Sequence, residues 1–260
     1  MEPAVYEQTL RVPYYFGDRY GRMNLPYLMN ILIEISGEQT TAVGAVPVEE
    51  LGLHWIIIQY ELKINRMPNT NEVIMVRTFT KEHNRIFSYR EFEVFDEEGH
   101  LLLEVLTVFA LIDENRKLSR IPKEIVKGYG STENRRIRRM PKPALPNNLE
   151  EAHRRDYNVR YFDIDTNFHA NNSMYYIWIL DALGDKFLAT HDPVYGNVVF
   201  EKEVHVGEKV ESYVDLVVDE KDTLVSRHQI QVHDIVKCTA TFTWEENGRE
   251  YRAPQVNDEE

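Results

Sequence analysis

Three polar residues at alternate positions, Asp165, Asn167 and His169, directly precede an apolar segment that is typical of a buried helix. If the turn is extended, residues at alternate positions project to one side, so a carboxylate, an amide and an imidazole would lie together. The helix start behind them, at Asn171 and Asn172, offers unpaired N–H groups and the positive end of a helix dipole. Such a start suits a developing oxyanion, and histidine is the usual proton carrier near neutral pH. The pattern therefore predicts proton-transfer chemistry beside an oxyanion site.

A turn that only caps the helix is the alternative, since Asp and Asn are common in turns and caps. That alternative is sufficient for Asp165 alone. It explains the trio less well, because a histidine adds little to a turn.

Composition and charge exclude several other classes of site. The 260 residues hold 30 Lys and Arg against 43 Asp and Glu, a net charge of −13, so phosphate repulsion opposes general nucleic-acid binding. The single cysteine, Cys238, rules out an internal disulfide and a cysteine-based zinc site, and its alternating apolar neighbours predict a buried thiol. No metal motif, phosphate loop or dinucleotide-binding glycine pattern occurs, so we expect no metal and no cofactor. No apolar run could span a bilayer and no leader segment opens the chain, so we expect a cytoplasmic protein.

The chain contains two copies of one pattern. Residues 12–18 align without a gap on residues 159–165, and at the same offset Asn24 falls on Asn171. An apolar segment with helical features follows each copy, and the predicted helices cover residues 25–43 and 173–188.

Strand-like segments with short connections follow each predicted helix. They cover residues 55–64, 72–80, 85–95 and 101–112 in the first half, and 198–206, 210–218, 223–232 and 235–244 in the second, with initial strands at 6–15 and 156–162. Short connections such as Asp96–Gly99 imply antiparallel neighbours, and a sheet curled around an apolar helix covers it on several sides. We therefore expect an α+β fold of two antiparallel sheets, each wrapped around a central helix, whose sheets pair. The expected divisions are residues 1–127, a linker at 128–152 that is rich in Pro, Asn and charge, and residues 153–260.

The segment from Asp165 to Trp178 resembles the signature of plant and bacterial acyl-acyl carrier protein thioesterases, Asp-x-Asn-x-His-x-Asn-Asn followed by an aromatic and aliphatic helix. The likeness runs from Tyr14 through residues 118–123 to Trp244. The resemblance implies a tandem double hotdog fold. It also implies hydrolysis of fatty acyl thioesters carried by acyl carrier protein, without a cofactor.

The resemblance also implies a catalytic glutamate on a strand after the second helix. Phe200-Glu-Lys-Glu203-Val204 matches the family segment and assigns that role to Glu203, while Val204 replaces the cysteine of plant members and excludes a thiol nucleophile there. In the first half, Lys63 falls opposite Glu203 and Arg22 opposite His169, so we expect one active site per chain.

We expect water to attack the thioester directly, because no Ser or Cys lies within the motif. Glu203 and His169 would form the general-base pair, with the division between them open. Asn167 would position water or polarise the carbonyl, and Asp165 would orient Asn167 and the helix-start amides. A thiolate with a reference pKa of about 8.5 leaves with little acid assistance.

The resemblance places the acyl chain inside the first half, between helix and sheet. Residues that would line this pocket, and that ordinary core packing explains equally, are Leu28, Ile31, Leu32, Ile35, Trp55 and Ile57. The carrier protein is acidic like this chain, so docking needs a local basic surface. The candidates, which a solvated linker would also explain, are Arg135, Arg136, Arg138, Arg139 and Lys142.

Three alternative functions stay open from the sequence: a coenzyme A thioesterase, a hydratase of unsaturated acyl thioesters, and a non-catalytic acyl-binding protein. The sequence does not determine the preferred acyl length and saturation. Both a monomer and a homodimer are compatible with it.

Overall fold

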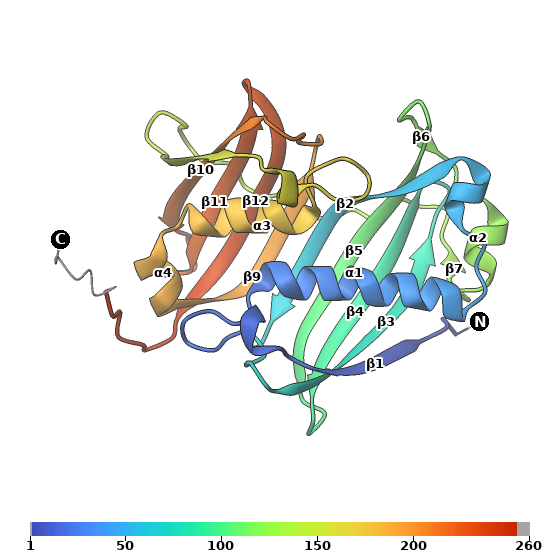
Figure 1. Ribbon diagram of the computed structural model, residues 1–260, viewed down its shortest axis with the longest axis horizontal. Helices are drawn as coiled ribbons and strands as arrows, with labels where there is room; N and C mark the ends of the chain where they lie inside the picture. The colour runs from blue at the N-terminus through green and yellow to red at the C-terminus, as the bar shows by residue number, and fades with distance from the viewer. Residues whose placement is uncertain (1, 254–260) are drawn as a thin grey trace.

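The computed structural model describes residues 2–253, and each half is a helix that lies on antiparallel strands (Figure 1). The first half contains β1 (Tyr6–Arg11), α1 (Leu25–Ala42), β2 (Leu53–Ile64), β3 (Val73–His83), β4 (Phe87–Asp96), β5 (Leu101–Asp113), β6 (Leu118–Ser119), α2 (Lys123–Lys127) and β7 (Thr132–Glu133). The second half contains β8 (His153–Asn158), α3 (Asn172–Asp181), α4 (Asp185–Thr190), β9 (His191–Phe200), β10 (Lys209–Val218), β11 (Leu224–Val232) and β12 (Ile235–Glu246). Short 3-10 turns occur at Tyr14–Phe16, Val48–Leu51 and Tyr161–Asp163.

Within residues 2–253, the sheets of the two halves join edge to edge into one sheet of 12 strands, in which the short strands β6 and β7 pair with β5 and β3 outside the main order. The strand order is β1-β3-β4-β5-β2-β9-β12-β11-β10-β8, and β2 pairs with β9 antiparallel at the centre. The predicted pairing of the two sheets is therefore present as a continuous hydrogen-bonded ladder. This pairing joins the C-terminal end of β2, at Gln59–Lys63, to the C-terminal end of β9, at Tyr195–Val199.

The helices α1 and α3 lie on the same face of this sheet and contact each other (Figure 1). Leu28 and Leu32 of α1 and Tyr176 and Ile179 of α3 are fully buried in one core cluster with strand residues such as Tyr60. Burial of apolar side chains in this cluster is the main force that holds the helices on the sheet. Cys238 is also fully buried there, as predicted, and burial raises the pKa of its thiol.

Two predicted element boundaries in the second half are wrong. The predicted helix 173–188 is two helices, because Gly184 adopts a φ of 83° between α3 and α4. That conformation is easily reached only by glycine, and it ends the helical hydrogen-bonding pattern. The strand expected at residues 198–206 is β9 at His191–Phe200, which pairs along its length with β12.

The segment that links the halves crosses the face of the sheet opposite the helices. Pro141 O accepts hydrogen bonds from Gln59 Nε2 at 2.7 Å and Asn197 Nδ2 at 3.0 Å, and the Ala144 N–H donates to Thr241 Oγ1 at 2.7 Å. These side chains alternate along their strands with core residues, so they point away from α1 and α3. Within residues 2–253, no helix combines the length and the apolarity that a bilayer crossing requires.

Candidate active site

The turn that carries Asp165, Asn167 and His169 reverses the chain within five residues. The Asp165 N–H donates to His169 O at 2.9 Å, and Phe168 adopts a left-handed φ of 63°. The Asp165 Oδ1 accepts the backbone N–H of Asn167 at 2.8 Å. The condition of an extended turn is therefore not met, because Asp165 closes a tight turn with its own carboxylate. All three residues nevertheless line one cavity.

His169 and Glu203 are in direct contact in that cavity. His169 Nε2 lies 3.0 Å from Glu203 Oε2, and the His169 side chain is 20% exposed. Glu203 lies three residues beyond the end of β9, in a loop rather than on the predicted strand. Two contacts hold that loop beside the turn: the Ala170 N–H donates to Val204 O at 2.8 Å, and Lys237 Nζ donates to Glu203 O at 2.8 Å. The backbone therefore positions the carboxylate independently of its side-chain partner.

Arg116 of the first half also reaches this pair, which the sequence did not predict. It follows β5 in the turn before β6, adopts a φ of 62°, and its guanidinium contacts Glu203 Oε1. The internal repeat gave a usable signal for this arginine. Glu114-Asn-Arg116 follows β5, the last long strand of the first half, and Glu246-Asn-Gly-Arg249 lies at the end of β12, the last long strand of the second half. Arg116 reaches across the β2–β9 pairing to Glu203 of the opposite half, whereas Arg249 lies 3.5 Å from Asp192 of its own half.

His205 is a second residue that sequence reasoning missed. Its ring centroid lies 5.1 Å from that of His169. One ring nitrogen each of His169 and His205 and a carboxylate oxygen of Glu203 all lie within 4.8 Å of one another. Burial, followed by the charges of Arg116 and His205, lowers the pKa of His169 below its usual value. The imidazole is therefore neutral, and able to accept a proton, over a wider pH range than a free histidine.

This surrounding predicts how activity depends on pH. Because protonation of His169 removes the base, the acid limb of kcat/KM should lie below the ordinary histidine pKa of about 6.5. Arg116→Gln removes one positive charge, so the pKa of His169 rises and the acid limb should move to higher pH. The measurement is a kcat/KM profile of both proteins. Lys117→Gln is the matched control, since Lys117 is an exposed neighbour without an ion pair among the described residues; a limb that moves equally in both variants contradicts the assignment.

The start of α3 lies at the cavity, and of the two residues expected to hold the oxyanion, only Asn172 has a free backbone N–H among residues 2–253. The Asn171 N–H already donates to Asp163 O at 2.9 Å, and Asn171 Oδ1 caps the helix by accepting the Ser173 N–H at 2.9 Å. The Asn172 N–H has no backbone acceptor among residues 2–253 and lines the cavity. The exposed Asn167 side chain makes no hydrogen bond within the same described part of the chain, so Asp165 does not orient it.

The cavity has a volume of about 1270 Å³ and extends from this site along α1 into the first half. Of the six residues predicted for the acyl pocket, Trp55 and Ile57 line this cavity. The other four predicted lining residues, Leu28, Ile31, Leu32 and Ile35, are buried in the core instead. The reason is the orientation of α1 about its own axis. The side of α1 that faces the cavity carries Met29, Ile33, Ser36 and Thr40.

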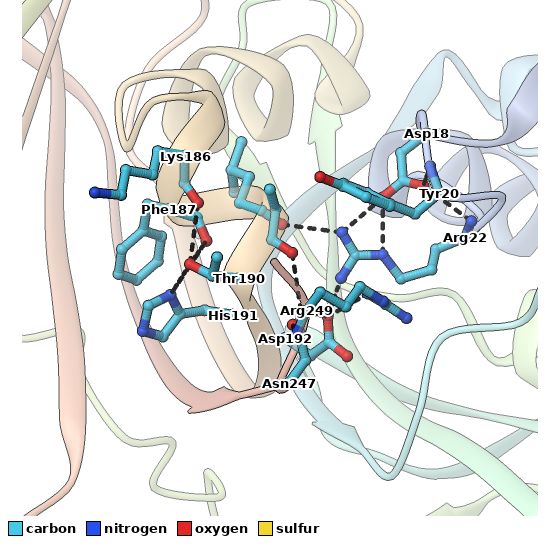
Figure 2. Close-up of polar contacts among 12 residues, drawn as sticks. Asp18, Tyr20, Arg22, Lys186, Phe187, Thr190, His191, Asp192, Asn247 and Arg249 are labelled. Carbon is cyan, nitrogen blue, oxygen red and sulfur yellow. Dashed lines mark hydrogen bonds and ion pairs between the residues drawn. The ribbon is translucent and has the colours of Figure 1, made fainter. Parts of the chain in front are cut away.

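The corresponding turn of the first half contains no acid–base pair. Arg22 occupies the position of His169, and its guanidinium donates to Asp18 Oδ2 at 2.8 Å and Leu188 O at 2.9 Å and contacts Asp192 (Figure 2). Next to this arginine lies α4, in which the Phe187 ring stacks on the ring of His191 in β9, with 4.2 Å between the ring centroids (Figure 2). The chain therefore presents one His–Glu site among its described residues.

The predicted match between Lys63 and Glu203 is wrong. The Met23 N–H donates to Pro68 O as the Ala170 N–H donates to Val204 O, both at 2.8 Å. By this equivalence Met67 lies opposite Glu203, whereas Lys63 stays in β2 and pairs with Glu104 at 3.7 Å. The first-half loop thus lacks a carboxylate at that place.

The five predicted docking residues all lie exposed in the segment that links the halves. Arg138 Nη1 lies 3.7 Å from Glu82 Oε1 at the rim of the sheet. Residues Arg135, Arg136, Arg139 and Lys142 have no acidic partner among the described residues. The segment therefore presents accessible positive charge on an acidic protein.

Known proteins resemble the chain along nearly all of its length. The models of the acyl-ACP thioesterase N-terminal and C-terminal domains match residues 3–129 and 147–246. An oleoyl thioesterase (putative) from Lactobacillus plantarum is 33% identical with a TM-score of 0.90, and the match covers 94% of this chain and 97% of that chain. A 12:0-ACP thioesterase from Umbellularia californica, 19% identical, shares the fold with a TM-score of 0.83 over 93% of this chain and 94% of its own.

Curated relatives include a chloroplastic acyl-[acyl-carrier-protein] hydrolase of Cuphea viscosissima, 25% identical over 173 residues, which are 62% of this chain. An oleoyl-acyl carrier protein thioesterase of Coriandrum sativum is 22% identical over 222 residues, or 77% of this chain. The matches cover only 41% and 59% of those two longer proteins. The fold expected from the sequence, two antiparallel hotdog halves around central helices, is confirmed by the solved structures. The chain belongs to the acyl-ACP thioesterase family.

Proposed function

We propose that this protein hydrolyses fatty acyl-acyl carrier protein thioesters to a free fatty acid and the carrier thiol. The observation that carries the proposal is the His169–Glu203 pair, 3.0 Å apart, at one end of a cavity of about 1270 Å³. A base beside a long cavity that is lined in part by apolar side chains is the combination that acyl thioester hydrolysis requires. Family membership supports the same reaction.

In the proposed mechanism, the His169–Glu203 pair takes a proton from water as the water attacks the thioester carbon. Arg116 and His169 hold one oxygen each of the Glu203 carboxylate, which fixes its orientation. The Asn172 N–H at the start of α3 stabilises the oxyanion, with help from the helix dipole. The intermediate collapses by expelling a thiolate, which needs little acid assistance.

Direct attack by water is more compatible with the single, buried cysteine than an acyl-enzyme intermediate is. The one cysteine, Cys238, is fully buried, and burial raises the pKa of its thiol well above the usual value. Val204 stands beside Glu203 and offers no nucleophile. A burst of thiol release larger than the release of free acid would contradict this step.

The proposed activity is tested by incubating the protein with acyl carrier thioesters of different length and saturation. We expect free thiol in equal amount to free acid, the acid being identified by mass. Loss of the absorbance of an unsaturated thioester without thiol release would indicate a hydratase instead. Tight ligand binding without turnover would indicate an acyl-binding protein.

Docking of an acidic carrier to the segment that links the halves is a further part of the proposal. Arg139→Glu should raise KM for an acyl carrier substrate about two- to fivefold and leave KM for the acyl-coenzyme A substrate nearly unchanged. Lys221→Glu makes the same charge change at the exposed turn between β10 and β11 and should affect neither KM. Equal effects of Arg139→Glu on both substrates would contradict docking at this segment.

A further inference from the structure

Arg90 of β4 is a buried cation at the wall of the acyl cavity. It is 6% exposed and lines the cavity through the inward face of its strand. Its Nη1 donates to Thr78 Oγ1 at 3.2 Å and contacts Gln39 Oε1, and its guanidinium carbon lies 5.3 Å from the centroid of the Tyr129 ring. None of the carboxylates in residues 2–253 forms an ion pair with it. Arg90 is thus a buried charge whose described partners are all uncharged.

The neighbours of Arg90 are already engaged with one another. Gln39 Nε2 donates to Ala4 O at 2.7 Å and Thr78 O at 3.2 Å, and the Tyr129 hydroxyl donates to Thr40 Oγ1 at 2.7 Å. Burial lowers the pKa of Arg90 to about 10, so the guanidinium remains charged at neutral pH. A buried charge without a counterion is costly unless further acceptors reach it.

This polar region lies at the end of the cavity remote from the catalytic pair. In the sheet, β4 is separated from β9 by β5 and β2, so three strand spacings of about 4.8 Å lie between Arg90 and the strand before Glu203. Apolar lining residues lie between the two ends, including Met29, Ile33 and Ile57. Hydroxyl-bearing residues surround the Arg90 end, namely Ser36, Thr40, Thr80, Ser88 and Tyr129. The cavity therefore has a cationic, hydroxyl-rich end, and its wall along α1 combines apolar side chains with Asn30 and Glu34.

We propose that Arg90 binds the far end of the acyl chain and selects chains that end in an oxygen acceptor, a hydroxyl or a carboxylate, over chains that end in a methyl group. A guanidinium offers five donors; the contacts with Gln39 and Thr78 use Nη1 and the Tyr129 side chain is a further hydrogen-bond partner, which leaves donors for a ligand. An oxygen at the chain end completes these hydrogen bonds, whereas a methyl group leaves them unmade. The inference rests on the proposed function, because it assigns the opposite end of the same substrate.

The test compares kcat/KM for acyl carrier substrates of equal length that end in methyl, hydroxyl or carboxylate, over a series of lengths. At the length that reaches Arg90, we expect the oxygen-terminated chain to be favoured, and Arg90→Met to lower that ratio about 10- to 100-fold. Arg90→Lys retains a cation and should retain part of the preference. Because the ratio is taken within one preparation, a variant that folds incompletely lowers both rates and leaves the ratio unaffected.

The matched control is Glu91→Gln, which lies next to Arg90 on the outward face of β4 and pairs with Lys81 at 3.0 Å. It should leave the ratio unchanged. The same ratios are measured for binding of the free acids by calorimetry, so the inference is tested even if no thioester is hydrolysed. Equal affinity for methyl- and oxygen-terminated acids at every length overturns the role of Arg90 alone. Absence of thiol release with the preference intact overturns the proposed reaction instead.

Discussion

Replacing Glu203 with glutamine should lower kcat for acyl carrier substrates by about two to four orders of magnitude. The amide keeps the size of the side chain and its placement beside His169, but it cannot hold the proton that water loses. Since the backbone around Glu203 is fixed by Lys237 and by Ala170, the loop should keep its conformation in the variant. The expected defect is therefore in the chemical step and not in binding.

Single-turnover rates and substrate affinity separate these two effects. In Glu203→Gln, we expect the rate of the chemical step to fall while the dissociation constant of the acyl carrier changes by less than about threefold. Glu220→Gln makes the same chemical change in the exposed turn between β10 and β11 and should turn over normally. A Glu203→Gln enzyme that retains full kcat would remove Glu203 from the mechanism.

The two members of the pair should also act as a unit. His169→Asn and Glu203→Gln each break the same proton path, so the double variant should be little slower than the worse single variant. If the two defects multiply, the residues contribute separately. Either result decides between a shared base and two independent roles, which sequence reasoning left open.

The pairing of His169 with Glu203 was implied by the family resemblance of two short segments, and backbone hydrogen bonds hold each of these segments in place. Arg116 could not be found in that way. Only the pairing of β2 with β9 brings the turn after β5 beside the loop after β9, and no local pattern encodes that approach. Internal repetition was only a partial signal: Arg249 also follows the last long strand of its half, but it pairs with Asp192 of that same half.

The cavity wall could be predicted only in part, for a reason that concerns helix geometry. The helix α1 is covered on several sides, so apolar residues occupy both the stripe that packs into the core, such as Leu28 and Leu32, and the stripe that faces the cavity, such as Met29 and Ile33. Hydrophobic periodicity identifies the helix but does not tell a packed neighbour from an empty space. Trp55 and Ile57 lie at the cavity because β2, the strand that carries them, runs along it.

The pairing of β2 with β9 places the loop of Glu203 next to the turn of Arg116, so the packing at this seam supports the active site. Gly196 of β9 lies opposite Phe242 of β12 on one side and Leu62 of β2 on the other. A Cβ at Gly196 would lie 2.7 Å from Phe242 Cε1 and 3.2 Å from Leu62 Cδ1. The fully buried Phe242 ring therefore occupies the space that a side chain at residue 196 would need.

Phe242→Ala should lower the free energy of unfolding by about 3–5 kcal/mol, because it removes a fully buried ring and leaves a cavity. Gly196→Ala alone should lower it by about 1–3 kcal/mol through overpacking. In the Phe242→Ala background, the added methyl enters vacated space, so the same glycine substitution should cost less by about 0.5–3 kcal/mol. Urea unfolding of the four proteins measures this coupling. Gly37→Ala is the control, since a Cβ there meets nothing within 4 Å in the middle of α1 and should raise stability by about 0.5–1 kcal/mol. If the two changes in the free energy of unfolding are additive, the Phe242 ring does not require a glycine at residue 196. The packing between β2 and β9 would then depend on other residues.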